Sequence, residues 1–379
     1  METVALDPER QKQAKAYSRI SRRLMLIDLA LAGLYALAWL AFGWSAGVRS
    51  WLSGFIPSVW LLVLAYALVF GGIYFLIHLP LSYYSDFVLP HRFGQSTETP
   101  RGWVGDQLKG IALNAVMGGV LLEIVYAGLR AYPDTWWIWV TIILLLFSVL
   151  LANLAPVLLM PIFNKFVPLG PEHQALVERL TRLFERAGTR VEGVYQFDMS
   201  RRTRSANAAL TGLGNTRRII LGDTLLSEFS IDEIETVMAH ELGHHVNRDI
   251  PVSIAAQALL TVVGLWLASL GLRWGAAQFG LRGASDIAAL PVLMLVIGLY
   301  ELVTLPLSNA LTRRQESKAD EYALRTTRNP QAFASAMTRL ANQNLSEVDP
   351  EPWVELLLYT HPALGRRIKM AEEFKAQTF

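Results

Sequence analysis

The stretch that decides the fold covers residues 237–260 and reads VMAHELGHHVNRDIPVSIAAQALL. Three of the chain's seven histidines, His240, His244 and His245, fall within six residues of it. From residue 250 the sequence becomes almost uniformly apolar and stays so to about residue 272. That length of apolar sequence is enough to cross a bilayer as a helix. The stretch therefore predicts a histidine-rich polar site at the edge of a membrane.

The composition is that of a membrane protein. Of the 379 residues, 53% are hydrophobic and 17% are charged, against about 25% charged in an average soluble domain. The mean hydropathy is +0.32, and 11 Trp and 12 Tyr could form interfacial aromatic belts. A net charge of +2 argues against a nucleic-acid partner. The chain has no Cys, so His and carboxylate side chains must hold any metal.

Six segments are long and apolar enough to span a bilayer. They cover residues 24–48, 57–79, 108–129, 135–160, 250–272 and 287–309. Six Lys and Arg residues lie between positions 10 and 23, and Arg92, Arg101 and Lys109 follow the second span. Positive charge marks the cytoplasmic side. We therefore expect the N-terminus, the C-terminus and the polar segment 161–249 to be cytoplasmic.

The segment 161–249 has the patterns of a small α+β domain. Helical periodicity covers 171–187, a strand is indicated near 191–197, and residues 205–223 read as two strands around a Gly-Asn turn. Ser230 and Glu233 form a capping box. This box predicts the start of the helix that carries the three histidines.

The histidine pair has the spacing of a metal site. His240 and His244 are four residues apart, so on a helix they stack on one face and can both bind one Zn²⁺. Glu241 is placed to take a proton from a water molecule at that metal. Together they make the H-E-x-x-H motif of metallopeptidases. His245 points about 100° away from His244, toward a polar face.

A zinc site of this kind needs a third protein ligand. Glu316 and Asp320 are four residues apart on the helix that leaves the sixth span, on the same side as His244. Glu316 can face the two histidines, and Asp320 can bond the far nitrogen of one of them. From spacing alone, a solvated, salt-bridged helix face is the favoured interpretation, because a Glu and an Asp four residues apart among Arg and Lys usually form one. The remaining histidines are further candidates: His78, His91, His173 and His361.

The motif H-E-L-G-H at 240–244, followed by two spans and by R-R-x-E-x-x-x-D at 313–320, resembles the type I CAAX prenyl endopeptidase family. Members of that family are integral-membrane zinc metallopeptidases. Similar stretches lie at 79–94, 154–169, 200–212, 217–226 and 361–367. The resemblance implies that Glu316 is the third zinc ligand. Eukaryotic members have seven spans around a large chamber, whereas six are expected here.

The resemblance also implies roles for residues outside the zinc site. Asn207 and Ala208 would lie at a sheet edge and contact the substrate backbone, as in peptide binding by strand addition. His361 and Arg367 would stabilise the oxyanion of the tetrahedral intermediate. The plainer alternatives are a turn flank for the first pair and an ordinary helix start with a solvated Arg for the second.

The expected fold class is mainly α: a multi-pass helical membrane protein of about six spans with a cytoplasmic zincin-type α+β metallopeptidase domain. Five parts follow one another along the chain. They are a cytoplasmic tail at 1–23, spans one to four at 24–160 with a cytoplasmic loop at 80–107, a cytoplasmic catalytic domain at 161–249, spans five and six at 250–309, and a C-terminal catalytic part at 310–379.

The expected function is peptide hydrolysis by a membrane-embedded zinc metalloendopeptidase of a bacterial inner membrane, with one Zn²⁺ per chain. Its partners would be the lipid bilayer and a peptide or membrane-protein substrate. Two substrate classes stay open: prenylated CaaX peptides, and misfolded or stalled membrane proteins. The alternative from another class is a non-catalytic membrane scaffold or transporter with a vestigial site.

Overall fold

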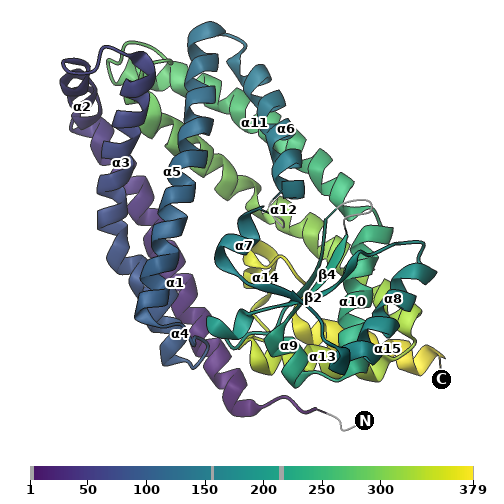
Figure 1. The fold of residues 1–379 in the computed structure, drawn as a ribbon. Helices are drawn as coiled ribbons and strands as arrows, with labels where there is room; N and C mark the ends of the chain where they lie inside the picture. The colour runs from purple at the N-terminus through teal and green to yellow at the C-terminus, as the bar shows by residue number, and fades with distance from the viewer. Residues whose placement is uncertain (1–3, 155–157, 213–216, 379) are drawn as a thin grey trace.

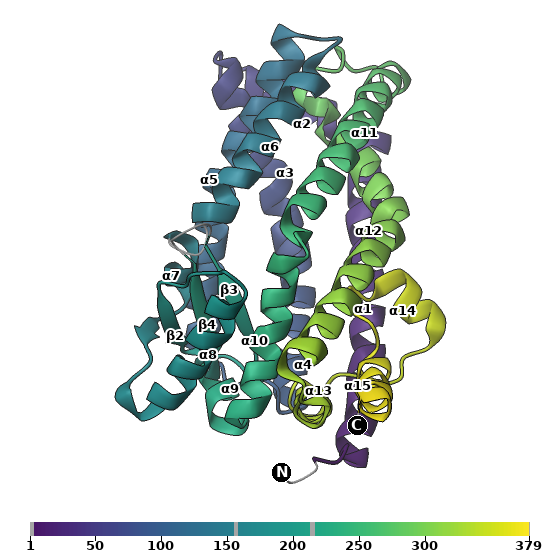
Figure 2. The ribbon, with the colours of Figure 1, turned by 90° about the vertical axis from the view of Figure 1, so that its right-hand side faces the viewer.

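Long helices dominate the computed structural model, which describes residues 4–154, 158–212 and 217–378. They form a bundle with the small α+β domain at one end, where α11 and α12 run into it (Figures 1 and 2). Both chain termini lie at the end that carries this domain. This arrangement puts the polar segments on one side of the expected membrane.

Within the described residues, five helical segments are long and apolar enough to cross a bilayer: Pro8–Ala41, Val59–Arg92, Pro100–Ala131, Asp249–Gln278 and Ile287–Thr327. They contain helices α1 (Pro8–Ala41), α3 (Val59–Ser82), α5 (Pro100–Ala131), α11 (Asp249–Gln278) and α12 (Leu290–Thr327). Five of the six expected spans are found in this way. The chain is therefore an integral membrane protein by length and composition.

The remaining expected span, at 135–160, is not among these five segments. Its helix is α6, Trp136–Leu154, and the apolar stretch Trp136–Leu151 is shorter than the length required of a span. The expected range also includes residues 155–157, which lie outside the described residues.

Several helices extend beyond the expected spans. Helix α1 already starts at Pro8, capped by the Asp7 side chain, so most of the expected tail is helical. Helix α3 continues through a π-helical turn, Tyr83–Val88, into α4, Leu89–Arg92. Between α1 and α3 lies a short helix, α2 (Trp44–Ser53), at the end of the bundle away from the α+β domain (Figure 1).

The α+β domain is built on a four-stranded mixed sheet in the order β1-β2-β4-β3. Its strands are β1 (Phe166–Pro168), β2 (Gly193–Phe197), β3 (Ala208–Thr211) and β4 (Arg218–Gly222). The expected pair at 205–223 is the antiparallel pair β3–β4, and its turn includes residues 213–216, outside the described residues. Strand β1 was not expected from the sequence. β3 pairs only with β4 among the described strands, so it lies at a sheet edge.

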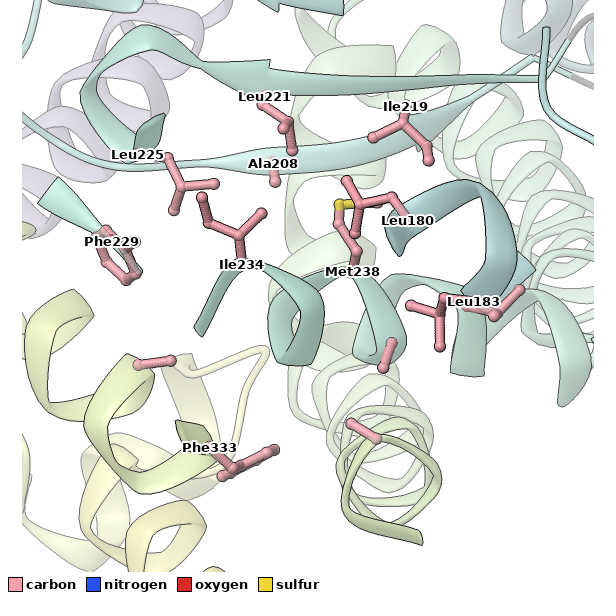
Figure 3. Close-up of a cluster of buried hydrophobic side chains, with 14 of the residues drawn as sticks. Leu180, Leu183, Ala208, Ile219, Leu221, Leu225, Phe229, Ile234, Met238 and Phe333 are labelled. Carbon is pink, nitrogen blue, oxygen red and sulfur yellow. The ribbon is translucent and has the colours of Figure 1, made fainter. Parts of the chain in front are cut away.

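One face of the sheet is covered by α10 (Ile231–Val246) and α8 (Gln174–Arg186) (Figure 3). Ile234 and Met238 of α10 pack against Leu221 and Ala208 of the sheet, and Phe333 lies on the far side of α10. These side chains are almost completely buried. Burying apolar side chains of this size stabilises a fold by about 1.5–3 kcal/mol each. The core thus fixes α10 between the sheet and the C-terminal helices.

The C-terminal segment completes the domain with α13 (Pro330–Gln343), α14 (Pro352–Leu358) and α15 (Leu364–Thr378). The Asn329 side chain caps α13 by accepting a hydrogen bond from the Ala332 amide. Helix α1 binds the last turn of α13 and the segment that follows it. Arg10 Nε donates to the Asn342 carbonyl over 3.1 Å, and the Val348 amide donates to Gln11 Oε1 over 3.2 Å. The first helix of the chain therefore holds part of the last segment in place.

Candidate metal centre and active site

Helix α10 begins where the capping box predicts. Ser230 Oγ accepts from the Glu233 amide, and Glu233 Oε2 accepts from the Ser230 amide. The apolar side chains Ile234, Met238 and Leu242 are buried in the core. Because helical positions repeat every 3.6 residues, the face that carries His240 and His244 is then turned toward α12.

Close packing brings α10 and α12 together at Gly243. A Cβ atom on Gly243 would lie 3.0 Å from Ala319 Cα and 3.1 Å from the Ala319 carbonyl oxygen. Real Cβ atoms rarely approach backbone so closely, so glycine is the residue that permits this contact. The approach places Glu316, on α12, opposite the two histidines.

Three donor atoms converge between the two helices. Nε2 of His240 and Nε2 of His244 are 3.2 Å apart. Glu316 Oε2 is 3.2 Å from His240 Nε2, and Glu316 Oε1 is 3.4 Å from His244 Nε2. One ligand atom from each residue lies within 4.8 Å of the others.

These residues fit a metal ion. Ligands bound to Zn²⁺ at 2.0–2.2 Å in a tetrahedral site lie about 3.4 Å from one another, close to the separations seen here. Glu316 Oε2 is buried and has no hydrogen-bond partner among the described residues. A buried carboxylate oxygen without a partner is costly, and a cation placed between the three side chains would remove that cost.

Each histidine is oriented by a carboxylate on its other ring nitrogen. His240 Nδ1 lies 2.8 Å from Asp320 Oδ1, and His244 Nδ1 lies 2.8 Å from Asp249 Oδ2. When Nδ1 donates to a carboxylate, Nε2 keeps its lone pair and can act as a metal ligand. Both rings therefore point their free nitrogens at the same position.

The charges of the site suit proton transfer. Burial raises the pKa of Glu241 above its ordinary value, although the neighbouring His240 and His244 oppose the shift. A carboxylate with a raised pKa is a better proton acceptor near neutral pH. Burial alone would lower the pKa of His240, but the neighbouring carboxylates of Asp320 and Glu316 raise that pKa to about 9.

The structure places the two expected oxyanion-stabilising residues, His361 and Arg367, in different surroundings. His361 Nε2 lies 3.3 Å from Glu316 Oε1, and 55% of the His361 side chain is exposed, so it borders the donor cluster from the open side. Arg367 is buried and donates through Nε and Nη2 to both oxygens of Asp320, over 2.8 Å and 2.5 Å. Its guanidinium therefore lies behind His240.

Asn207 and Ala208 lie at the start of the edge strand β3. The Asn207 carbonyl accepts from the Gly222 amide over 2.9 Å. The Ala208 side chain is buried and points into the core (Figure 3), so only its backbone could meet a bound peptide.

Two residues of the site were not expected from the sequence. Asp249 orients His244, and Gln315 Nε2 donates to the Asp249 carbonyl over 3.3 Å. The spacing of five residues from His244 to Asp249 gives no helical signal, because Arg248 adopts a left-handed backbone with φ 58° between the two helices. An acidic residue at the start of α11 was the available clue.

A buried His-His-Glu cluster beside a glutamate, at the end of a helical membrane bundle, defines a membrane metalloprotease. Two family models match the chain: peptidase family M48 over residues 171–375, and the CAAX prenyl protease N-terminal region, described as five membrane helices, over residues 3–165. The chain belongs to peptidase family M48 and is a membrane metalloprotease of its CAAX prenyl protease branch.

Relatives support the same assignment. The chain is 29% identical to an uncharacterised metalloprotease, YhfN, of Bacillus subtilis over 97% of this chain and 87% of YhfN. It is 31% identical to CAAX prenyl protease 1 of Saccharomyces cerevisiae over 77% of this chain and 68% of the yeast protein. The crystal structure of S. mikatae Ste24p matches with a TM-score of 0.87 at 26% identity, over 97% of this chain and 90% of that one. None of these relatives favours a scaffold or transporter.

Proposed function

We propose that the protein is a zinc metalloendopeptidase in which His240, His244 and Glu316 hold one Zn²⁺. The observation that carries the proposal is the convergence of three donor atoms within 4.8 Å beside Glu241. The ligand set of two imidazoles and one carboxylate, with an open side at His361, is that of catalytic rather than structural zinc. Zinc bound there would polarise the peptide carbonyl and lower the pKa of a water molecule.

The protein residues supply the proton transfers. Glu241 takes a proton from water as the oxygen of that water attacks the carbonyl carbon of the peptide bond. The C–N bond then breaks, and Glu241 passes the proton to the leaving amine. His361 would donate a hydrogen bond to the carbonyl oxygen as negative charge develops on it. Arg367 would act through Asp320, which fixes the ring of His240.

The substrate would bind as an added strand on β3. Backbone groups around Asn207 and Ala208 would pair with an extended peptide, which needs no particular side-chain sequence. The site lies where α11 and α12 reach the α+β domain, so substrates could enter from the aqueous side or from the bilayer. Both prenylated CaaX peptides and segments of misfolded membrane proteins could bind in this extended form and enter by these routes.

For localisation, we propose a bacterial inner membrane with both termini and the catalytic site in the cytoplasm. The concentration of Lys and Arg in residues 10–23 and the match to a Bacillus subtilis relative support this orientation and host. Reporter fusions at the two termini test it. Both should report cytoplasmic exposure, and a reporter active on the outer side at either end would refute the orientation.

The decisive experiment compares purified wild type with Glu241→Gln and His240→Ala. Metal content is measured by elemental analysis, and cleavage is measured on a prenylated CaaX peptide and on an unfolded membrane-protein fragment. We expect wild type and Glu241→Gln to hold one zinc per chain, His240→Ala to hold little, and only wild type to cleave. Equal cleavage by Glu241→Gln, or no zinc in wild type, would refute the proposal. The substrate that is cleaved decides between the two classes.

A further inference from the structure

A basic pocket lies beside the metal centre but outside it. It has a volume of about 710 Å³ and is lined by the first turn of α11, by residues 310–318 of α12 and by the start of α15. Four cationic side chains line it, Arg313, Arg314, Lys318 and Arg366, with Asp249 as the one carboxylate of the lining. We refer to it as the basic pocket.

Two of the four cations are already engaged by protein groups. Arg313 Nη1 donates to the carbonyls of Glu355 and Tyr359, over 3.0 Å and 2.6 Å. Arg366 forms an ion pair with Glu355.

The other two cations, Arg314 and Lys318, are exposed. Neither makes an ion pair within the described part of the chain. The pocket's carboxylate, Asp249, contacts His244 and forms no ion pair with Arg314 or Lys318 among the described residues. The pocket therefore presents two cations without an ion-pair partner.

The pocket lies at the depth where lipid headgroups are expected. Its lining residues lie at the start of the apolar stretch of α11, near residue 250, and just beyond the end of the apolar stretch of α12, near residue 309. On the membrane side, Val252 and Leu307 are exposed, at 47% and 67%. Figure 2 shows α11 and α12 running side by side into the α+β domain at this level.

Helix α14 gives a separate indication of where the membrane–water boundary lies. Trp353 and Leu356 on it are 58% and 57% exposed, and Asn309 Nδ2 donates to the Leu357 carbonyl over 2.8 Å. Exposed Trp beside exposed Leu is typical of the membrane–water boundary. The apolar surface of α14 thus continues that of α12 at the boundary, and the basic pocket opens among the same helix ends.

We propose that the basic pocket binds the phosphate headgroup of an anionic phospholipid, with Arg314 and Lys318 as its main contacts. The acyl chains would lie against the exposed apolar side chains of α11 and α12. Basic pockets between membrane helices are suited to anionic headgroups, and each cation near a membrane surface strengthens such binding. The proposal depends on the position of the pocket in the membrane and not on peptide hydrolysis.

Lipid binding to the full chain tests the proposal directly. Native mass spectrometry of the detergent-solubilised protein is titrated with phosphatidylglycerol or phosphatidylcholine of identical acyl chains. Wild type should prefer phosphatidylglycerol, and Arg314→Gln/Lys318→Gln should weaken that binding by about tenfold while leaving phosphatidylcholine binding unchanged. The matched control is Arg186→Gln/Arg190→Gln, which removes two exposed positive charges from the α8 region and should behave as wild type. An unchanged phosphatidylglycerol preference in Arg314→Gln/Lys318→Gln would overturn the proposal.

A second measurement leaves the cations in place. Because the chain has no cysteine, Leu311→Cys in the pocket lining can carry a single bimane label. Headgroup-spin-labelled phosphatidylglycerol should quench this label more strongly than the phosphatidylcholine analogue. Val303→Cys, 69% exposed on α12 away from the pocket, should show no such preference. Equal quenching by both lipids at residue 311 would contradict a headgroup site.

The competing occupant is the free carboxylate of a peptide substrate. If the pocket served that purpose, Arg314→Gln/Lys318→Gln would raise KM for a peptide with a free C-terminus and not for its amidated form. That result, together with unchanged lipid binding, would overturn the lipid proposal.

Discussion

Asp320 Oδ1 lies 2.8 Å from Nδ1 of His240, across the contact between α12 and α10. The same carboxylate accepts two hydrogen bonds from Arg367 and is completely buried. One side chain therefore orients a histidine of the candidate metal site and joins three helices that are distant in sequence.

The first prediction is that Asp320→Asn lowers the metal affinity roughly 10- to 100-fold, the usual effect of losing a residue that orients a ligand. An amide keeps the size of the side chain but removes the negative charge that fixes the ring of His240. The measurement is competition with a chromophoric chelator. Asp249→Asn is the matched variant for His244 and should also weaken binding. Wild-type affinity in both variants would show that these carboxylates do not support the metal.

The second prediction concerns Arg367. Arg367→Gln leaves Asp320 buried without its cation, and breaking a buried pair in this way typically costs about 3–5 kcal/mol. We expect a clearly lower midpoint of thermal unfolding, with partial rescue by Arg367→Lys. If instead Arg367→Gln unfolds at the wild-type temperature and loses only kcat, a direct contact with substrate is the better explanation.

The third prediction separates His361 from the metal ligands. His361→Ala should lower kcat by about 10²–10³-fold, the usual cost of removing one oxyanion donor. Zinc content and thermal stability should stay at the wild-type level, because more than half of the side chain is exposed. Loss of zinc from this variant would instead assign His361 to the metal site.

The fourth prediction tests the close contact at Gly243. A valine there has no room against the Ala319 backbone, so Gly243→Val should separate α10 from α12 and abolish metal binding. Gly243→Ala should have a smaller effect in the same direction. The readouts are zinc content and unfolding temperature. The control is Gly110→Ala on α5, where a Cβ meets no atom within 4 Å.

The fifth prediction is a dependence of stability on pH through Glu233. Burial favours its neutral form, but hydrogen bonds from Ser335, from the Ser230 amide and from Arg339 hold the pKa of Glu233 below its ordinary value of 4.5. A carboxyl whose pKa is lower in the folded state contributes stability above about pH 4.5, and that contribution is lost as the pH falls further.

Thermal unfolding of wild type and Glu233→Gln across pH 3.5–7 checks this. The variant should be less stable at neutral pH by about 1–3 kcal/mol, the value of hydrogen bonds to a charged group. The difference should shrink in acid. A constant difference over the whole range would mean that the charge of Glu233 plays no part.

Local patterns predicted the elements that depend on local physics. The capping box predicted the start of α10, and the length of the apolar runs predicted five of the long helices. The meeting of Glu316 with the two histidines could be anticipated because adjacent spans bring their ends to the same side of a membrane.

Other features have no local signal. The hydrogen bond between Gln11 and Val348 joins residues 337 positions apart, and the sequence of neither segment predicts it. Asp249 comes within hydrogen-bond distance of His244 because Arg248 between them adopts a left-handed backbone conformation. Arg367 is buried because it pairs with Asp320, a residue of another helix. The residues around Arg367 in the sequence do not reveal this partner, and the expected role was contact with the oxyanion of the substrate.

The residues of the candidate metal centre are far apart in the sequence, so they are synthesised at different times. His240 and His244 are synthesised before Glu316, which follows only after most of α11 and α12. A nascent chain thus carries the two histidines without Glu316 until the apolar stretches of α11 and α12 have been made. The donor cluster is therefore completed only after both of these helices have been synthesised.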